Sequence, residues 1–409
     1  MSAIKRFIKS NDKLFHGLKS GLLYVRYVKS IVQPQRYVGL SKVKASLEYV
    51  IGEKGYHCWF GYYDKSPMNV SNQYVAYTKV SLSAKPGDVA EVCIYDIKSK
   101  ESKVVGKTTT WNWQQGCMPQ WVSETLLRYN AFDNVSKQYV TIIVDVESGS
   151  EGRYNRACYA ANMDHSAFLS LNFYRLDKYA KGYGYPFKTD AMDYEKDGIW
   201  ETTVLDNKTT LLLSLARIIE YNKHYDDDCQ HYINHVTYCP NKNLIMFIHR
   251  WQKTGTEFTS RLLIYNRTTD KLDTLLDSGH VSHYCWKSDD VLMIYATNAR
   301  GEKGYMTVNI TTKETALIKG RPKEDGHPTY SKDGGIILTD TYPNNHRDQY
   351  LFLFDDVRHE LRILDKLYSP FKYFNDERCD LHPRWNYDCS CVMVDNTNLG
   401  RRTLKVYKL

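Results

Sequence analysis

Four of the thirteen histidines in this chain stand where new, aromatic- or proline-marked segments begin. They are His235, His283, His327 and His382, and the last two are followed directly by proline. Neutral imidazole nitrogens are good ligands for divalent metals, so histidines that converge in space would form a metal site. Any one of them alone is better explained as a hydrogen-bonding device that starts a strand. Four of them on successive segments favour a shared site.

Arginines accompany these histidines along the sequence. A planar guanidinium is the natural partner of a carboxylate or a sulfate. We therefore expect Arg175, Arg250 and Arg384 to contribute to binding of an anionic ligand. Structural alternatives stay open, because Arg384 stands beside Trp385 and would stack on its ring. Arg378 and Asp380 would equally pair with each other.

Further candidates stand next to these positions. His249, beside Arg250, is a candidate catalytic residue, and Trp251 and Tyr183 are candidates for holding a substrate. Tyr342 and Tyr183 are candidate proton donors. Most aromatic residues of this tyrosine-rich chain should lie in the core, although rings at loop level stack well on sugars.

The elements that must position these side chains are short strands in a repeated unit. From Tyr49 onward a marked opening, a polar turn and Val-, Ile- and Tyr-rich strands recur at the spacing of propeller blades. Seven openings predict an all-β, seven-bladed β-propeller, in which equivalent positions of successive blades face one axis. The openings are residues 65–67, 118–121, 162–165, 237–240, 283–286, 327–330 and 382–385.

We expect residues 49–409 to form the propeller and residues 1–48 a separate basic segment. The last unit is short, so residues 49–60 would supply its missing outer strand and close the ring. The third unit is overlong, and residues 176–200 are expected to form a loop over one face.

The segment 1–48 carries much of the net charge of +8 and is expected to be helical or irregular. A basic amphipathic helix would contact a membrane surface or a biosynthetic complex, or serve only as a packing appendage. No signal peptide or membrane span is recognisable, and the ten cysteines lack disulfide spacing, which favours a cytoplasmic protein. The charges outside this segment are mixed in sign, which disfavours nucleic-acid binding. Its apolar positions are Ile4, Phe7, Ile8, Phe15, Leu18 and Leu22, and its basic residues are Lys5, Arg6, Lys9, Lys13, Lys19, Arg26, Lys29, Arg36, Lys42 and Lys44.

Several of these motifs together resemble a known group of bacterial propellers. The runs 111–121, 234–235, 325–328 and 379–385 are similar to those of the oligogalacturonate lyase and ulvan lyase group, and the similarity covers nearly all of the chain after about residue 50. The resemblance also implies an association with genes for capsule or exopolysaccharide synthesis. The resemblance implies a seven-bladed propeller that cleaves an anionic poly- or oligosaccharide by β-elimination.

Residue roles follow from the same resemblance. His283, His327 and His382 would bind a divalent metal ion, with manganese, calcium and zinc as the candidates. His235 would be the base, and Arg250 or Arg175 would hold the uronate.

Other functions remain open at this stage. A noncatalytic glycan- or protein-binding propeller would need no base, and a hydrolase would need two facing carboxylates, for which Asp325 and Asp340 are the candidates. A glycosyl transferase would need a phosphate cradle. The sequence contains no Walker loop, G-x-G-x-x-G, G-x-S-x-G or HExxH motif, which disfavours kinases, serine hydrolases and zincins.

Overall fold

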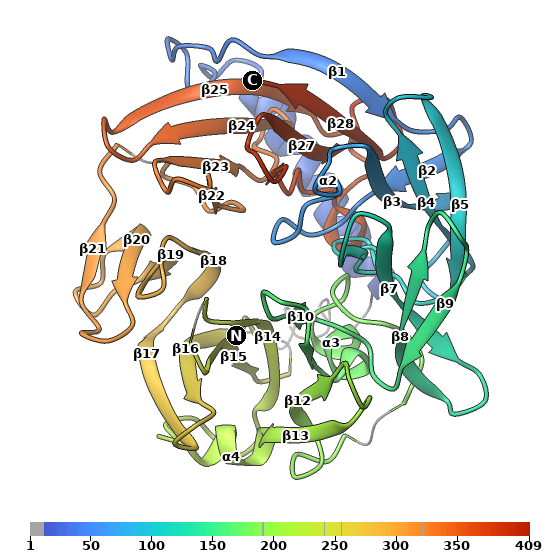
Figure 1. Cartoon of the computed structure of the whole chain (residues 1–409). Helices are drawn as coiled ribbons and strands as arrows, with labels where there is room; N and C mark the ends of the chain where they lie inside the picture. The colour runs from blue at the N-terminus through green and yellow to red at the C-terminus, as the bar shows by residue number, and fades with distance from the viewer. Residues whose placement is uncertain (1–11, 190–191, 241, 255, 321) are drawn as a thin grey trace.

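Seven four-stranded antiparallel sheets are arranged in a ring around a central axis (Figure 1). The structure is a computed structural model that describes the backbone of residues 12–189, 192–240, 242–254, 256–320 and 322–409, with side chains from residue 17. The predicted all-β, seven-bladed propeller is therefore confirmed. All ten cysteines are free thiols.

The first three blades are each built from four consecutive strands. Their strands are β2 (Tyr56–Trp59), β3 (Tyr74–Ser81), β4 (Ala90–Asp96), β5 (Glu101–Thr108), β6 (Gln120–Trp121), β7 (Leu126–Asp133), β8 (Gln138–Asp145), β9 (Glu151–Tyr154), β10 (Ala160–Ala161), β11 (Ala167–Ser170), β12 (Gly198–Thr203) and β13 (Thr209–Ser214).

Blades 4 to 6 repeat this order. Their strands are β14 (Gln230–Tyr238), β15 (Leu244–Gln252), β16 (Thr259–Asn266), β17 (Lys271–Gly279), β18 (Val281–Trp286), β19 (Val291–Thr297), β20 (Lys303–Asn309), β21 (Thr315–Leu317), β22 (Thr329–Tyr330), β23 (Ile336–Asp340), β24 (Asp348–Asp355) and β25 (Glu360–Tyr368).

The middle strands of the blades are apolar on both faces because each blade is sandwiched between its neighbours. Every residue of β24 is buried, and β15 is buried at all but its two ends. The outermost strand β5 is largely exposed and carries charged residues, which protects the rim of the ring from pairing with another chain.

Blade 7 joins the two ends of the chain. It consists of β26 (Arg384–Trp385), β27 (Cys391–Asn396) and β28 (Thr403–Lys408), and β1 (Ser46–Ile51) pairs with β28 as its outer strand. Residues 56–59, which the sequence assigns to the same closing segment, instead form the innermost strand of blade 1. One blade thus contains strands from both chain ends, which closes the ring.

Several expected blade openings lie at the outer end of an innermost strand or just after it. Residues 65–67 follow β2, residues 162–165 form the turn after β10, and residues 237–240 include the end of β14. The reason is that the proline and polar residues mark the turn between the first two strands of a blade, which is a stronger local signal than the short first strand itself.

The basic N-terminal segment contains helix α2 (Asp12–Ser30) and an extended stretch that lies against blade 6, where Val43 pairs with Ile363. In Figure 1 the helix lies behind the ring of blades. No helix among the described residues is long and apolar enough to cross a membrane. The expected positions Ile4, Phe7 and Ile8, with Lys5, Arg6 and Lys9, lie outside the described residues, as do the side chains of Lys13 and Phe15.

The long insertion of blade 3 begins with helix α3 (Phe173–Tyr179), whose N-cap Asn172 accepts a hydrogen bond from the Arg175 amide. A short helix α4 (Leu215–Glu220) follows β13, and a 3-10 turn η1 (Asn375–Glu377) lies between β25 and β26. Gln114 links the insertion to the end of the η1 turn, because its amide donates to Gly182 O and its side chain donates to Arg378 O.

Candidate active site at the propeller axis

Four histidines from four adjacent blades form a row around the axis. His235 lies on β14 and His283 on β18. His327 and His382 are each followed by a proline, after which β22 and β26 begin. Their ring centroids are 5.3, 4.2 and 4.3 Å apart in that order. All four side chains are buried. The structure thus brings together the histidines that the sequence singled out.

Two of these histidines have left-handed backbone conformations. His235 has φ +50° at a point where the register of β14 and β15 shifts, and His382 has φ +44°. Such a conformation costs roughly 1–3 kcal/mol in a residue with a Cβ, and residues of this kind cluster at functional sites. The backbone is therefore bent in a way that aims both rings at the axis.

Asp340 fixes the orientation of His327. Its carboxylate lies 2.9 Å from His327 Nδ1 and accepts the backbone N–H groups of His327 and His382 at 2.7 and 3.2 Å. This contact places the ring proton on Nδ1 and leaves the lone pair on Nε2. A carboxylate behind a histidine is the usual arrangement around a metal-binding imidazole.

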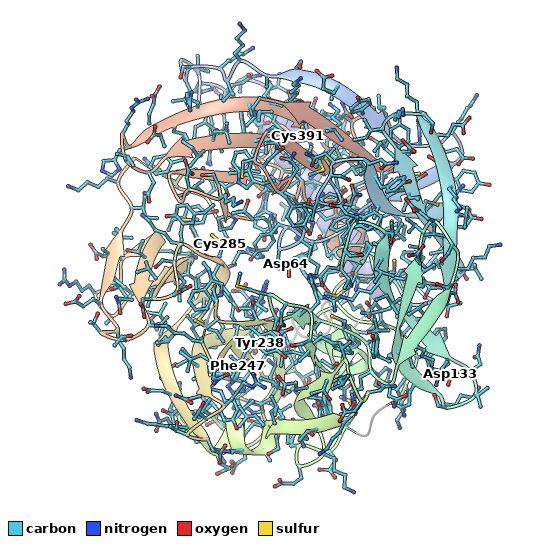
Figure 2. All side chains as sticks on the ribbon, viewed as in Figure 1. Asp64, Asp133, Tyr238, Phe247, Cys285 and Cys391 are labelled. Carbon is cyan, nitrogen blue, oxygen red and sulfur yellow. The ribbon has the colours of Figure 1, made fainter. Side chains whose placement is uncertain are left out.

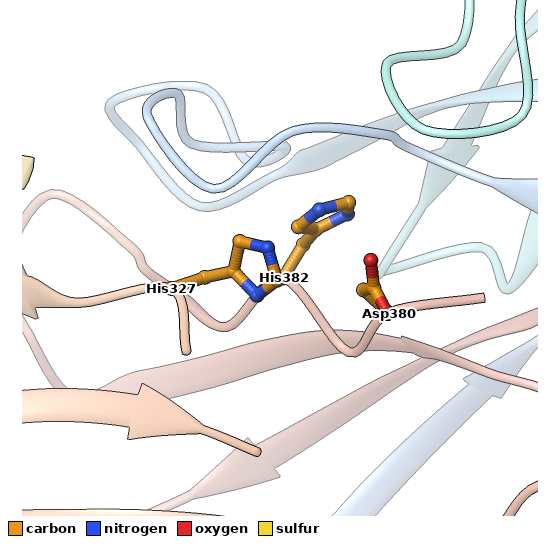
Figure 3. A group of neighbouring side chains, drawn as sticks. All are labelled: His327, Asp380 and His382. Carbon is orange, nitrogen blue, oxygen red and sulfur yellow. The ribbon is translucent and has the colours of Figure 1, made fainter. Parts of the chain in front are cut away.

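A group of ligand atoms is available beside that lone pair. One donor atom each of His327, Asp380 and His382 lies within 4.8 Å of the other two, and all three residues are buried (Figure 3). The Nε2 atoms of both histidines have no hydrogen-bond partner among the described residues. Two unpartnered imidazole nitrogens and a carboxylate fit a divalent metal ion. We call these three residues the axial triad.

The axial triad differs from the ligand set expected from the sequence. His283 lies next to His327, but its Nδ1 is 3.3 Å from Asp325, and it is not part of the triad. Asp380 takes its place although it also receives two hydrogen bonds from Arg378, at 2.6 and 2.7 Å. The signal in the sequence was the Asp-Leu-His spacing, because residues two apart in an extended segment point to one side.

The surroundings shift the pKa values of these histidines in different directions. Burial lowers the pKa of His235 and of His382 well below the usual value, and neighbouring histidines and arginines add to this effect. Burial also acts on His327, but the charge and hydrogen bond of Asp340 outweigh it and raise the pKa. For Asp380 the charge of Arg378 outweighs burial and lowers the pKa. His235 and His382 are therefore neutral bases at neutral pH.

Tyr62 fills the space inside the row of histidines. Its hydroxyl lies 3.0 Å from His235 Nδ1, and its ring centroid is 5.0 Å from that of His382. Burial raises the pKa of Tyr62 well above its usual value, so the hydroxyl keeps its proton. No sequence signal marks Tyr62, because it lies three residues after β2 and carries no distinguishing spacing among 34 tyrosines.

Arg250 is a buried cation without a carboxylate partner among the described residues. It is only 9% exposed, its guanidinium lies over the Phe258 ring at 4.4 Å, and its Nε has no hydrogen-bond partner. Its charge contributes to the lowered pKa of His235 and of His283, which places it beside the histidine row. A buried charge of this kind is costly unless a ligand pairs with it.

Tyr183 and Tyr342 lie near the same end of the axis. Tyr342 stacks under Arg378 at 4.7 Å and lies 5.5 Å from the His327 ring. Tyr183, from the blade 3 insertion, lies 6.2 Å from Tyr62. Burial raises the pKa of Tyr183 to about 12, and that of Tyr342 well above its usual value. The insertion therefore reaches the axis, as a loop over one face.

A cavity of about 260 Å³ reaches His235 from the other end of the innermost strands. Figure 2 shows Asp64 and Cys285, two of its lining residues, near the axis, whereas Asp133 lies at the rim. Trp286 and Tyr330, which follow His283 and His327 along their strands, also line it. Of the four histidines in the row, His235 is therefore the one that lines this cavity.

Two predicted arginines are engaged in buried ion pairs. Arg175 pairs with Asp197 and lies over the Tyr194 ring at 4.8 Å. Arg384 pairs with Asp395 and donates to Tyr62 O at 2.9 Å. Both side chains are almost fully buried, so neither offers its charge to a ligand. Arg384 instead positions the segment that carries Tyr62.

His249 and Trp251 lie in a separate cluster within blade 4. Both ring nitrogens of His249 are occupied, one by His231 Nδ1 at 3.1 Å and the other by Arg261 Nε at 3.1 Å. Trp251 packs against Tyr225 with centroids 4.9 Å apart. Their neighbour Arg250 points to the opposite face of β15, because successive residues of a strand alternate between its two faces.

Comparison with known proteins supports the fold. No protein-family model matches the sequence, and no curated protein matches it. Oligogalacturonate lyase from Vibrio parahaemolyticus superposes with a TM-score of 0.63 at 11% identity, covering 90% of this chain and 97% of that one. An oligogalacturonate lyase in complex with manganese gives 0.64 at 13%, covering 90% and 98%. The propeller domain of the Trilobed protease from Pyrococcus furiosus gives 0.50 at 10%, covering 86% and 95%.

The chain shares its fold with these propellers. At such identities the likeness shows the architecture, which also carries proteolytic functions, and does not identify a substrate. The chemistry must therefore be argued from the site itself.

Proposed function

We propose that the protein is a lyase that cleaves a uronate-containing poly- or oligosaccharide by β-elimination. The observation that carries the proposal is the convergence of the axial triad (His327, Asp380 and His382), the neutral His235 and the unpaired cation Arg250. β-Elimination needs a base and a means of neutralising the substrate carboxylate, and these residues supply both. The manganese complex of a lyase with a similar fold is consistent with this chemistry.

The axial triad would hold the metal ion. When bound, a divalent cation supplies Lewis-acid neutralisation of the uronate carboxylate, which makes the proton at C5 more acidic. Manganese is our first candidate because mixed imidazole and carboxylate ligands suit it.

The protein's own residues would carry out the proton transfers. Arg250 binds the uronate carboxylate, and His235 accepts the C5 proton with its neutral ring nitrogen. The electron pair left at C5 forms the C4–C5 double bond, and the bond from C4 to the glycosidic oxygen breaks. Tyr183 or Tyr342 donates its proton to the departing oxygen, so that a new chain end and an unsaturated uronide result.

A glycoside hydrolase fits the axis less well. Its acid needs a carboxyl with a raised pKa, but hydrogen bonds and charges from His283 lower the pKa of Asp325 against the effect of burial. Asp340 already accepts hydrogen bonds from His327 and from the His382 backbone. A noncatalytic glycan-binding role would use the same Arg250 without turnover, and the assay below separates the two.

The test is ultraviolet absorbance of unsaturated uronides formed from a panel of uronate polysaccharides, including capsule and exopolysaccharide types. We expect a rise that manganese supports and that a chelator abolishes. Glycan binding without any absorbance change across the panel would establish the noncatalytic alternative.

A matched pair of variants tests the base. His235→Asn keeps a residue that tolerates the left-handed backbone, and it should lower kcat about 100-fold or more. His359→Asn is the control, because His359 is exposed in the turn between β24 and β25 and also has a positive φ of +57°. Equal activity of the two variants would exclude His235 as the base.

A further inference from the structure

Helix α2 presents an apolar face to solvent. Its least exposed positions are Leu23, Tyr27 and Ser30, and the Tyr27 ring packs on Phe371 with centroids 5.0 Å apart. These residues lie on one side of the helix and face the propeller. The other side of the helix is therefore turned outward.

That outward side consists of large apolar residues. Leu18, Leu22, Val25 and Val28 are 52%, 50%, 48% and 48% exposed, and their spacing of four, three and three residues makes one stripe along the helix. A helix that packs on a globular domain normally turns such a stripe inward. We call these four residues the outer stripe.

Basic residues accompany the outer stripe. Arg26 and Lys29 are exposed on α2. Residues 1–48 contain ten basic residues (Lys and Arg) and two acidic ones. The whole chain has 55 basic and 47 acidic residues, so the part after residue 48 has 45 of each and is neutral overall. The whole net charge of +8 thus belongs to the segment that carries the outer stripe.

The helix rests on the segment that carries two members of the axial triad. Phe371 and Asn375, which α2 contacts, belong to the connection between β25 and β26, and so do Asp380 and His382. Lys19 Nζ donates to Asn375 Oδ1 at 3.1 Å. The helix with the outer stripe therefore lies on the face of the propeller where the segment of Asp380 and His382 runs toward the axis.

We propose that α2 docks this face of the propeller on an anionic lipid surface. The outer stripe would enter the boundary between headgroups and acyl chains, and the basic residues would contact the headgroups. A second copy of this chain is a poorer occupant, because it would bring two strongly basic segments together.

Vesicle sedimentation of the full chain tests the docking. Wild type should bind phosphatidylcholine vesicles that contain phosphatidylserine, bind pure phosphatidylcholine much less, and dissociate in high salt. Leu22→Glu/Val25→Glu should weaken binding by roughly tenfold or more for each apolar residue lost. Arg26→Gln/Lys29→Gln should weaken it by about fivefold per charge.

The matched control is Val135→Glu/Leu205→Glu. These residues are 92% and 99% exposed in turns of blades 2 and 3, so the charge change is the same but lies away from α2. The control should bind like wild type, and circular dichroism should be the same for all variants.

Three outcomes would overturn the proposal: no binding of wild type to anionic vesicles, equal loss in the control, or a concentration-dependent dimer that Leu22→Glu/Val25→Glu abolishes without any vesicle binding. Cleavage of a soluble uronate glycan by Leu22→Glu/Val25→Glu should equal that of wild type. Failure of the docking is thus distinguishable from failure of the proposed lyase activity.

Discussion

His327 Nδ1 lies 2.9 Å from the Asp340 carboxylate, and the opposite ring nitrogen, Nε2, is left without a partner among the described residues. The two facts belong together, because the hydrogen bond to Asp340 decides which nitrogen keeps a lone pair. Asp340 is thus a positioning residue, and it also accepts the backbone N–H of His382.

Asp340→Asn should weaken manganese binding by about 10- to 100-fold, as loss of the carboxylate behind a metal-binding histidine usually does. Isothermal titration of the purified protein with manganese measures this directly. Asp388→Asn, in an exposed turn of blade 7, is the control and should leave the affinity unchanged. An unaltered affinity in Asp340→Asn would show that His327 is not a ligand.

Arg250→Met should lower kcat/KM for a uronate glycan by about 10- to 100-fold, since one charge-assisted hydrogen bond contributes roughly 1.5–3 kcal/mol. The free energy of unfolding should stay equal or rise, because a buried charge without a carboxylate partner is removed. Urea denaturation and the absorbance assay together check both parts. A loss of activity that only follows a loss of stability would contradict the binding role.

Tyr183→Phe should lower kcat more than Tyr342→Phe does. The pKa of Tyr183 is raised only to about 12, whereas that of Tyr342 is raised well above its usual value, so Tyr183 releases its proton more readily. We expect a loss of about 100-fold in kcat for Tyr183→Phe with little change in KM. The opposite order of the two variants would assign the acid to Tyr342.

Arg384→Met should destabilise the fold by about 3–5 kcal/mol, because it leaves Asp395 as an unpaired buried charge. This pair also joins blade 7 to blade 1, since Asp395 accepts the N–H groups of Phe60 and Gly61, each at 3.0 Å. Urea denaturation of Arg384→Met and of Arg384→Met/Asp395→Asn measures the effect. The double variant should recover part of the loss, and equal instability of both would mean that the pair's charges matter little.

The free energy of unfolding should fall as the pH is lowered from about 7 towards 4. Burial lowers the pKa of His57 and of His231 to about 4, and the unfolded value is near 6.5. Within this window the unfolded chain binds more protons, so acid favours unfolding. The raised pKa of His327 acts in the opposite sense, but the histidines whose pKa is lowered outnumber it.

Urea denaturation at several pH values checks this dependence. His231→Asn removes one of the titrating rings and should make the slope smaller in the same pH window. An unchanged slope would show that His231 is not neutral in the folded protein.

The sequence by itself determined the seven blades and the four axial histidines, and it predicted a helical or irregular segment near the N-terminus. Blade repetition made the histidine prediction possible, because positions that recur at the start of successive blades must meet at the axis. His249, Trp251, Arg175 and Arg384 were predicted from residue types along the sequence and from the resemblance to the lyase group. Only the tertiary structure shows that each of them is already engaged with a partner from another segment of the chain.

The tertiary structure also decided which side chains converge beside His327 and His382. Asp380 completes the axial triad because the segment before β26 is extended and carries it to the same side as His382, while Asp325 engages His283. Tyr62 reaches His235 from blade 1, 173 residues away. Such contacts depend on how blades are placed around the ring, and no local pattern of residues encodes that placement.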